Sequence, residues 1–363
     1  MWAMDQTTDN YIELKNINKH FGNYQASDNI NVTIKKGGLV ALLGPSGSGK
    51  TTILRMIAGL ETADSGDIYI DGKLVNNVEA SKRGIGFVFQ NYALFRYKTV
   101  YENIAFGLKV KKWSNKRIKE RVNELIQLVG LQGFERRFPN QLSGGQRQRI
   151  AFARALAPNP DVLLLDEPFA AIDAKVRQEL RSWLKEMIER VGITSIFVTH
   201  DQDEAMEVAD EIIITNKGKI EQIGSPQDIY KNPITAFVAE FMGQPVKVEQ
   251  ISRFRGYEHV SDNLKALIRP ENISITKQDE EIRYSSSVEE GIVERILFRG
   301  KEMEISVNVH GDCIKGIRRI EDVPVQKDEK VNVCIFLAYT YGNDSMITPI
   351  RNANINAEES VII

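Results

Sequence analysis

The sequence predicts an α/β domain that extends to about Gly243, followed by a smaller all-β domain. Up to that point, short runs rich in Val, Ile, Leu and Phe recur, and they occupy residues 39–43, 85–89, 162–165, 195–199 and 212–215. Near-continuous apolar runs of this length are typical of strands that are buried in a mostly parallel sheet. After Gly243, helical patterns become rare and short strand-like runs alternate with turn-like clusters.

Amphipathic helices are expected between the strands. One helix opens near Ser114, and its apolar face consists of Ile118, Val122, Leu125, Ile126 and Val129. A second helix ends at Gly192, and its apolar face consists of Val176, Leu180, Leu184, Met187, Ile188 and Val191. Apolar residues at this spacing lie on one face of a helix, and glycine is the usual residue of a left-handed cap. The alternation of strand and helix indicates an α/β domain.

The last third of the chain predicts a small all-β domain or barrel. Its strand-like runs are residues 266–268, 291–298, 304–309 and 331–337. Short strands separated by turn-like clusters are typical of barrels and sandwiches. We therefore expect a first domain over 11–243, a second over 244–350 and a tail over 351–363.

The composition is that of an ordinary globular protein and argues against a nucleic-acid partner. The 363 residues are 42% hydrophobic and 26% charged, with a formal net charge of -2. Cys313 and Cys334 lack metal-ligand spacing and indicate free thiols in a reducing compartment. No apolar run approaches the roughly 18–20 residues of a membrane span, and residues 1–10 do not resemble a secretory signal. Any membrane function is expected to depend on another chain.

A glycine-rich loop between a predicted strand and a predicted helix indicates a phosphate site. Its residues are Gly44, Pro45, Ser46, Gly47, Ser48, Gly49, Lys50 and Thr51, followed by Thr52. The glycines allow backbone N–H groups to point at a β-phosphate, Lys50 neutralises charge, and the Thr51 hydroxyl ligates Mg²⁺. The alternative is a glycine turn that only matches the pattern, which the strand before and the helix after it disfavour.

Two adjacent carboxylates end the predicted strand over residues 162–165. The carboxyl ends of strands in a doubly wound sheet face the ligand crevice. We expect Asp166 to hold Mg²⁺ and Glu167 to polarise the attacking water. The alternative is an acidic strand-to-loop exit, which is common by itself but less so beside a phosphate loop.

A second anion-binding site is predicted at Leu-Ser-Gly-Gly-Gln over residues 142–146. Ser143 is a good helix N-cap, and Gly144 and Gly145 leave the N–H groups of the helix start open, with Gln146 next. One γ-phosphate seldom needs two such sites from one chain, so this one is expected to serve the ATP of a partner chain. The alternative is a flexible Ser-Gly turn before a helix.

With these motifs in this order, residues 11–243 resemble the ABC ATPase cassette throughout. The resemblance implies that Gln90 senses the γ-phosphate and the membrane partner and contributes to the metal site, and that His200 contacts the γ-phosphate. Gln90, Glu167 and His200 are then the catalytic residues. Asp173 looks like the aspartate at the dimer interface, although Ile172 stands where Leu is usual.

The aromatic residue that stacks on adenine in this family corresponds to Phe21. Many members carry Tyr at this place, and the neighbouring Tyr24 competes for the role. The cofactors implied by the resemblance are ATP and Mg²⁺.

Residues 267–273 and 291–300 resemble the small, OB-like β-barrel that is appended to bacterial importer ATPases of the sugar, polyamine, iron and sulfate groups. Residues 87–96, 102–108 and 176–184 look most like the sulfate/thiosulfate group, although Tyr97 stands where His is common. Polyamine, iron and other oxyanion importers remain alternatives.

The partners implied by the resemblance are a second copy of the chain in an ATP-sandwich dimer, two integral membrane permease subunits and, indirectly, a solute-binding protein. The expected location is peripheral, on the cytoplasmic side of the cell membrane. A soluble ABC protein acting on ribosomes or DNA is a rival. It is disfavoured because the chain has one phosphate loop and no sustained heptads between Lys50 and Ser143. A P-loop kinase would leave residues 142–146 unexplained.

Overall fold

The computed structural model describes residues 10–170 and 174–355. The chain divides into two compact units, Met1–Ile229 and Tyr230–Ile363. None of the helices in the described ranges combines the length and the apolar character of a membrane span.

A six-stranded sheet forms the centre of the first unit, with the order β10-β9-β3-β8-β7-β6. The strands are β3 (Leu39–Leu43), β6 (Ile85–Val88), β7 (Val162–Asp166), β8 (Thr194–Thr199), β9 (Glu211–Asn216) and β10 (Lys219–Gly224). All neighbours pair in parallel except β9 and β10. Every residue of β3, β7 and β8 is buried, which explains the apolar runs that these strands contain. The predicted parallel sheet is confirmed.

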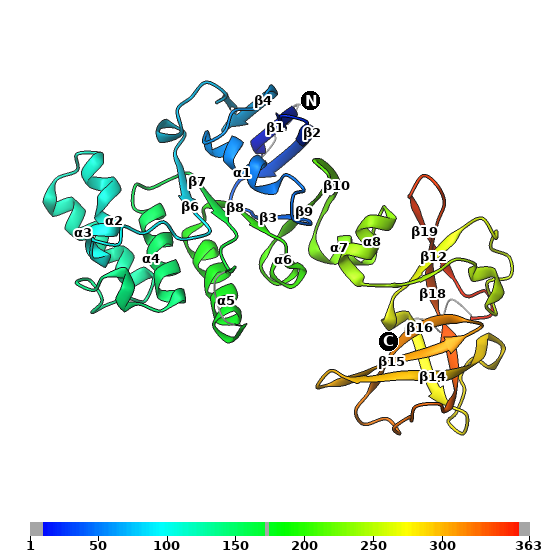
Figure 1. Ribbon diagram of the computed structural model, residues 1–363. Coiled ribbons are helices and arrows are strands. Elements are labelled where there is room, and N and C mark those ends of the chain that lie inside the picture. Colours follow the sequence, from blue (N-terminus) through cyan, green and yellow to red (C-terminus); the bar gives the residue numbers. More distant parts are fainter. Residues whose placement is uncertain (1–9, 171–173, 356–363) are drawn as a thin grey trace, which may run out of the picture. The chain divides into compact units, whose positions relative to one another are not determined.

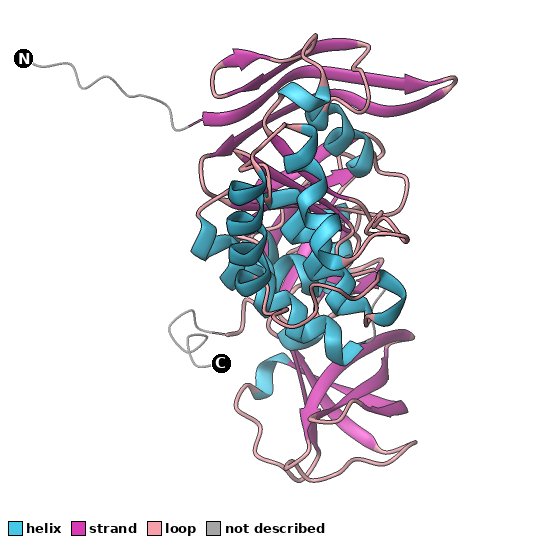
Figure 2. Ribbon diagram, turned by 90° about the vertical axis from the view of Figure 1, so that its left-hand side faces the viewer, coloured by secondary structure: helices cyan, strands magenta, loops and turns pink. Residues whose placement is uncertain are grey.

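A second, antiparallel sheet in the first unit has the order β2-β1-β4-β5. Its strands are β1 (Asn10–Phe21), β2 (Tyr24–Lys35), β4 (Ser65–Ile70) and β5 (Lys73–Leu74). Figure 2 shows it as magenta strands at the top of the view. The interior side chains of β1, β2, β3 and helix α1 (Lys50–Ala58) share one core cluster. The phosphate loop therefore leads into a helix that is packed against both sheets.

The remaining helices of the first unit are α2 (Val100–Val110), α3 (Asn115–Leu128), α4 (Gly144–Leu156), α5 (Ala174–Val191) and α6 (Gln202–Val208), with α7 (Pro226–Lys231) at its end. Helices α2, α3 and α4 pack together, with α4 against β6 (Figure 1). Ser114 caps α3, and Gly192 ends α5 at a φ of 67°. Val191 differs from the expected face, since it is 39% exposed in the last turn of α5.

The second unit contains two antiparallel sheets and helix α8 (Ala236–Gly243). One sheet has the order β13-β17-β14-β15-β16, from β13 (Ile273–Lys277), β14 (Val288–Phe298), β15 (Glu302–Val309), β16 (Asp312–Arg319) and β17 (Lys330–Ile335). The other has the order β11-β12-β18-β19, from β11 (Val246–Val248), β12 (Lys265–Ile268), β18 (Leu337–Tyr341) and β19 (Ile347–Arg351).

The five-stranded sheet curls into a half-barrel. Its edge strands meet at Gly316 of β16, where an added Cβ would lie 2.7 Å from a carbon of Ile275 on β13. Glycine at this position leaves room for the Ile275 side chain between the two edges. The predicted all-β region after the first domain is confirmed. Helix α8 packs on the four-stranded sheet through Ala236 and Ala239, which contact Leu267 and Tyr339.

Candidate active site

The phosphate loop lies between β3 and α1, and two of its glycines are required by their surroundings. A Cβ at Gly44 would lie 2.2 Å from the carbonyl oxygen of Thr215 on β9. A Cβ at Gly49 would lie 2.0 Å from the carbonyl oxygen of Ala26 on β2, and Gly49 has a φ of 97°. The two sheets therefore fix both ends of the loop. The lack of a side chain at Gly44 and Gly49 allows the loop to lie directly against β9 and β2.

The Lys50 side chain lies within the loop that precedes it. Its Nζ donates to the carbonyl oxygens of Gly44 and Pro45 at 2.8 and 2.7 Å and to Ser48 Oγ at 3.3 Å. Burial lowers the pKa of the Lys50 amine, and the carboxylates of Glu167 and Asp166 oppose that shift. The ammonium group is therefore oriented by backbone acceptors of the phosphate loop itself.

Thr51 and Asp166 provide adjacent oxygen atoms. Thr51 Oγ1 donates to Asp166 Oδ1 at 3.0 Å, which joins the start of α1 to the end of β7. Burial raises the pKa of the Asp166 carboxyl, and the hydrogen bond from Thr51 opposes that shift. A hydroxyl and one carboxylate fit the ligand set of Mg²⁺, which prefers oxygen and completes its shell with phosphates and water.

Glu167 is the meeting point of residues from three neighbouring strands. Gln90 follows β6, and its Nε2 donates to Glu167 Oε2 at 2.7 Å. His200 follows β8, and its Nδ1 lies 3.5 Å from Glu167 Oε1. Glu167 itself has a φ of 45°, a left-handed conformation that is uncommon for a non-glycine residue and frequent at functional sites. The three residues predicted to be catalytic therefore lie together.

A cavity of about 60 Å³ adjoins Glu167, and of its lining residues only Glu167 and His200 were predicted to belong to the site. It is lined by Glu167, Ala170, Arg177, Thr199, His200, Asp201 and Glu204. Glu204 is buried, accepts a hydrogen bond from Thr199 Oγ1 at 2.5 Å and lies 3.5 Å from Arg181 Nη2. Burial raises the pKa of the Glu204 carboxyl. A sequence pattern could have identified Glu204. Asp201 caps α6, and a glutamate three residues after a capping residue is typical of a helix start.

Ser143 begins helix α4 as predicted. Its Oγ accepts from the Gln146 N–H at 3.3 Å, and Gln146 Oε1 accepts from the Ser143 N–H at 3.0 Å, which completes a capping box. A Cβ at Gly145 would lie 3.2 Å from Val176 and 3.3 Å from Leu180. Glycine at this position therefore keeps α5 close to the first turn of α4.

Phe21 and Tyr24 are the two candidates for stacking on the adenine ring, and Tyr24 contacts the phosphate loop. Its hydroxyl donates to the carbonyl oxygen of Gly47. Phe21 pairs with Tyr24 across the turn between β1 and β2, both are 48% exposed, and Lys19 Nζ lies 5.1 Å from the Phe21 ring centre. The role of Phe21 stays a prediction. Asp173 lies outside the described residues.

Replacing Gly49 with alanine is expected to weaken ATP binding at least about tenfold. The new Cβ would overlap the Ala26 carbonyl oxygen, so the phosphate loop must move away from β2. A left-handed alanine alone costs about 1–3 kcal/mol. Gly47→Ala is the matched control, since Gly47 also has a left-handed φ of 78° but its Cβ would meet only Tyr24 Oη at 3.9 Å. ATP titration and thermal unfolding compare the two variants. Equal losses would show that the contact with Ala26 is unimportant.

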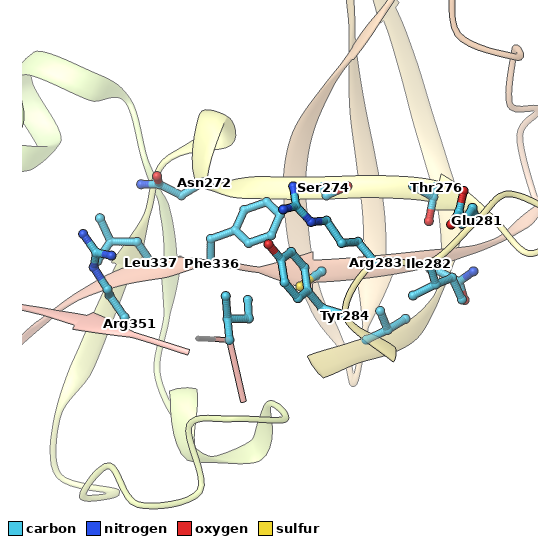
Figure 3. Close-up of a pocket in the computed structure, with 14 residues that line it drawn as sticks. Asn272, Ser274, Thr276, Glu281, Ile282, Arg283, Tyr284, Phe336, Leu337 and Arg351 are labelled. Carbon is cyan, nitrogen blue, oxygen red and sulfur yellow. The ribbon is translucent and has the colours of Figure 1, made fainter. Parts of the chain in front are cut away.

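The second unit has a cavity of its own, of about 290 Å³. Figure 3 shows Arg283, Tyr284 and Phe336 on its wall, where Arg283 Cζ lies 5.3 Å from the Tyr284 ring centre. Among the residues that the structure describes, none of those predicted for nucleotide chemistry lines this cavity.

Comparisons with known proteins identify the family of this chain. The family model described as ABC transporter matches residues 27–170. The sulfate/thiosulfate import ATP-binding protein of Mesostigma viride is 51% identical over 307 residues, covering 82% of this chain and 87% of that protein. The sulfate/thiosulfate import ATP-binding protein of Synechococcus elongatus is 57% identical over 237 residues, covering 65% of this chain and 69% of that protein.

Two solved structures share the cassette fold. The dimeric post-hydrolysis state of the ATP-binding cassette MJ0796, bound to ADP and Pi, is 37% identical with a TM-score of 0.53, covering 59% of this chain and 98% of that chain. The cbiO1 protein of Clostridium perfringens, part of an ABC transporter complex, is 31% identical with a TM-score of 0.58. The match covers 62% of this chain and 92% of that chain. This chain therefore belongs to the ABC transporter family and is one of its nucleotide-binding ATPase cassettes.

Proposed function

We propose that this chain hydrolyses ATP to energise the import of sulfate or thiosulfate. The observation that carries the ATPase role is the convergence of Gln90 and His200 on Glu167, beside the phosphate loop. Relatives at 51% and 57% identity that are named for sulfate/thiosulfate import support the solute. The same role in a polyamine, iron or other oxyanion importer is the alternative.

In the proposed site, backbone N–H groups of residues 46–52 and the Lys50 ammonium bind the phosphates of ATP. Thr51, Asp166 and Gln90 would hold Mg²⁺, which supplies positive charge beside the phosphates when it is bound. The Glu167 carboxylate orients the attacking water and accepts its proton. Gln90 orients that carboxylate through a hydrogen bond to Oε2, and His200 lies 3.5 Å from Oε1.

A second copy of the chain completes the site. Ser143, Gly144, Gly145 and Gln146 present the positive end of α4, which suits the γ-phosphate of ATP bound to the other copy. Asp173 is proposed to lie at the same dimer interface. The dimeric state of the similar cassette MJ0796 supports this arrangement.

Two membrane permease subunits are the proposed partners, and the chain would bind them at the cytoplasmic face of the membrane. A groove of about 730 Å³ suits such a partner; its lining is Asn91, Tyr92, Leu94, Arg96, Tyr97, Phe138, Pro139, Asn140, Gln141 and Arg147. It begins directly after Gln90, and Tyr97 is 94% exposed. The all-β second domain has no part in the proposed nucleotide chemistry, and we assign it a regulatory role.

Sulfate uptake in cells that lack this chain tests the solute. Growth on sulfate as sole sulfur source and uptake of labelled sulfate are both expected to fail, and the wild-type chain should restore them. The chain carrying Glu167→Gln is the matched control and should restore neither, although it is made in equal amount. Normal sulfate uptake with loss of polyamine or iron uptake would favour the alternative.

A further inference from the structure

The loop that follows Gln90 has an unusual backbone. Tyr92 and Ala93 are consecutive non-glycine residues in the left-handed region, with φ values of 61° and 46°. The Cβ of a non-glycine residue makes the left-handed region unfavourable, so such a conformation persists only where contacts with the surrounding structure stabilise it. The Tyr92 N–H donates to the Phe89 carbonyl oxygen at 2.8 Å, and the Tyr92 and Ala93 carbonyl oxygens both accept from one side chain.

Arg154 provides that side chain. Its Nη1 donates to the Ala93 carbonyl oxygen at 2.6 Å, and its Nη2 donates to the Tyr92 carbonyl oxygen at 2.8 Å. The guanidinium carbon also lies 5.6 Å from the Phe95 ring centre. Burial lowers the pKa of Arg154, and within residues 10–170 and 174–355 no carboxylate forms an ion pair with it. A planar guanidinium can bind two adjacent carbonyls at once, which a lysine ammonium cannot do with the same geometry.

The far side of the loop is held by α2. Asn103 Nδ2 donates to the carbonyl oxygens of Phe95, Lys98 and Thr99, and Asn103 Oδ1 accepts from the Phe95 N–H at 2.9 Å. The Phe95 ring lies 4.5 Å from that of Phe106 on the same helix. The loop is therefore fixed by two helices, and only one of them, α4, begins at the predicted anion site.

Helix α4 connects two functional regions. Ser143 caps its first turn and Arg154 lies near its end, about 16 Å away at 1.5 Å per residue. Arg147 of the same helix and Tyr92 of the loop both line the groove that begins after Gln90. A displacement of α4 therefore moves the carbonyls to which Arg154 is bonded.

We propose that Arg154 is a positioning residue that ties the loop after Gln90 to α4. Through it, binding of the second copy's nucleotide at the start of α4 is transmitted to the groove for the membrane partner. The transmission step rests on the proposed function, whereas the contact between Arg154 and the loop does not.

Trypsin cleavage after Arg96 and Lys98 reports on the loop directly. Arg154→Met keeps the apolar stem and removes both hydrogen bonds, so cleavage should become about tenfold faster, as expected when bonds to a charged group are lost. Arg149→Met is the control, because Arg149 is also on α4 but donates to the Val129 carbonyl at 3.3 Å and contacts Trp183. It should leave cleavage at Arg96 unchanged, and Arg154→Lys should give an intermediate rate. Equal rates in all four proteins would overturn the proposal.

The coupling is measured in the transporter assembled with its membrane subunits and solute-binding protein. Arg154→Met should abolish most of the stimulation of ATP hydrolysis by sulfate, while the ATP affinity of the isolated chain changes by less than about twofold. Full stimulation in this variant would overturn the transmission role. If ATP hydrolysis by the wild-type transporter is not stimulated by sulfate, the proposed solute is wrong. The trypsin experiment then still tests whether Arg154 holds the loop after Gln90.

Discussion

Replacement of Glu167 by glutamine is expected to lower ATP turnover by about 10²–10⁴-fold, the usual contribution of a general base. Glutamine keeps the shape of the side chain and its hydrogen bond to Gln90, which is 2.7 Å long in the native protein. It cannot accept the proton of the attacking water. ATP binding should be retained, because Lys50 and the loop N–H groups are unchanged.

The same substitution should lengthen the life of the ATP-bound dimer, since one negative charge that faces the triphosphate is lost. Gel filtration with ATP and limiting Mg²⁺, beside a turnover assay, measures both effects. Glu204→Gln serves as the comparison, because Glu204 is a buried carboxyl on the same 60 Å³ cavity. Near-normal turnover in the Glu167 variant would assign the base elsewhere, with His200, 3.5 Å away, as the next candidate.

Replacement of Ser143 by arginine is expected to abolish ATP turnover and to leave ATP binding by the same chain largely intact. The large cationic side chain would fill the anion site at the start of α4, which is proposed to face the ATP of the other copy. Loss of the cap, in which Ser143 Oγ accepts from the Gln146 N–H, costs about 1 kcal/mol, so the domain should still fold. Ser143→Asn is the control, since asparagine is also a good N-cap.

A mixture of two inactive variants tests the shared site more directly. Ser143→Arg is combined with Lys50→Met, so that the mixed dimer contains one site with an intact Lys50 from one copy and an intact Ser143 from the other. Partial recovery of turnover on mixing is expected. A monomeric preparation that hydrolyses ATP at a specific rate independent of protein concentration would contradict the shared site.

The amino-acid sequence determined the features that depend on neighbours in the chain. The phosphate loop, the strand ending in Asp166 and Glu167, and the cap at Ser143 are all short patterns whose geometry is set within a few residues. The helix over 115–128 was predictable because its apolar spacing matches one helical face. The buried parallel strands were predictable because their apolar runs are continuous.

The tertiary structure alone decided which distant residues meet. Strands β6, β7 and β8 are neighbours in the sheet, and this order brings Gln90, Glu167 and His200 together. Sequence spacing contains no information about strand order, because parallel strands are joined by long crossovers. For the same reason, the contacts of Gly49 with Ala26 and of Arg154 with Tyr92 could not be predicted. They depend on the packing of two sheets and of a helix against a loop, which short-range patterns do not specify.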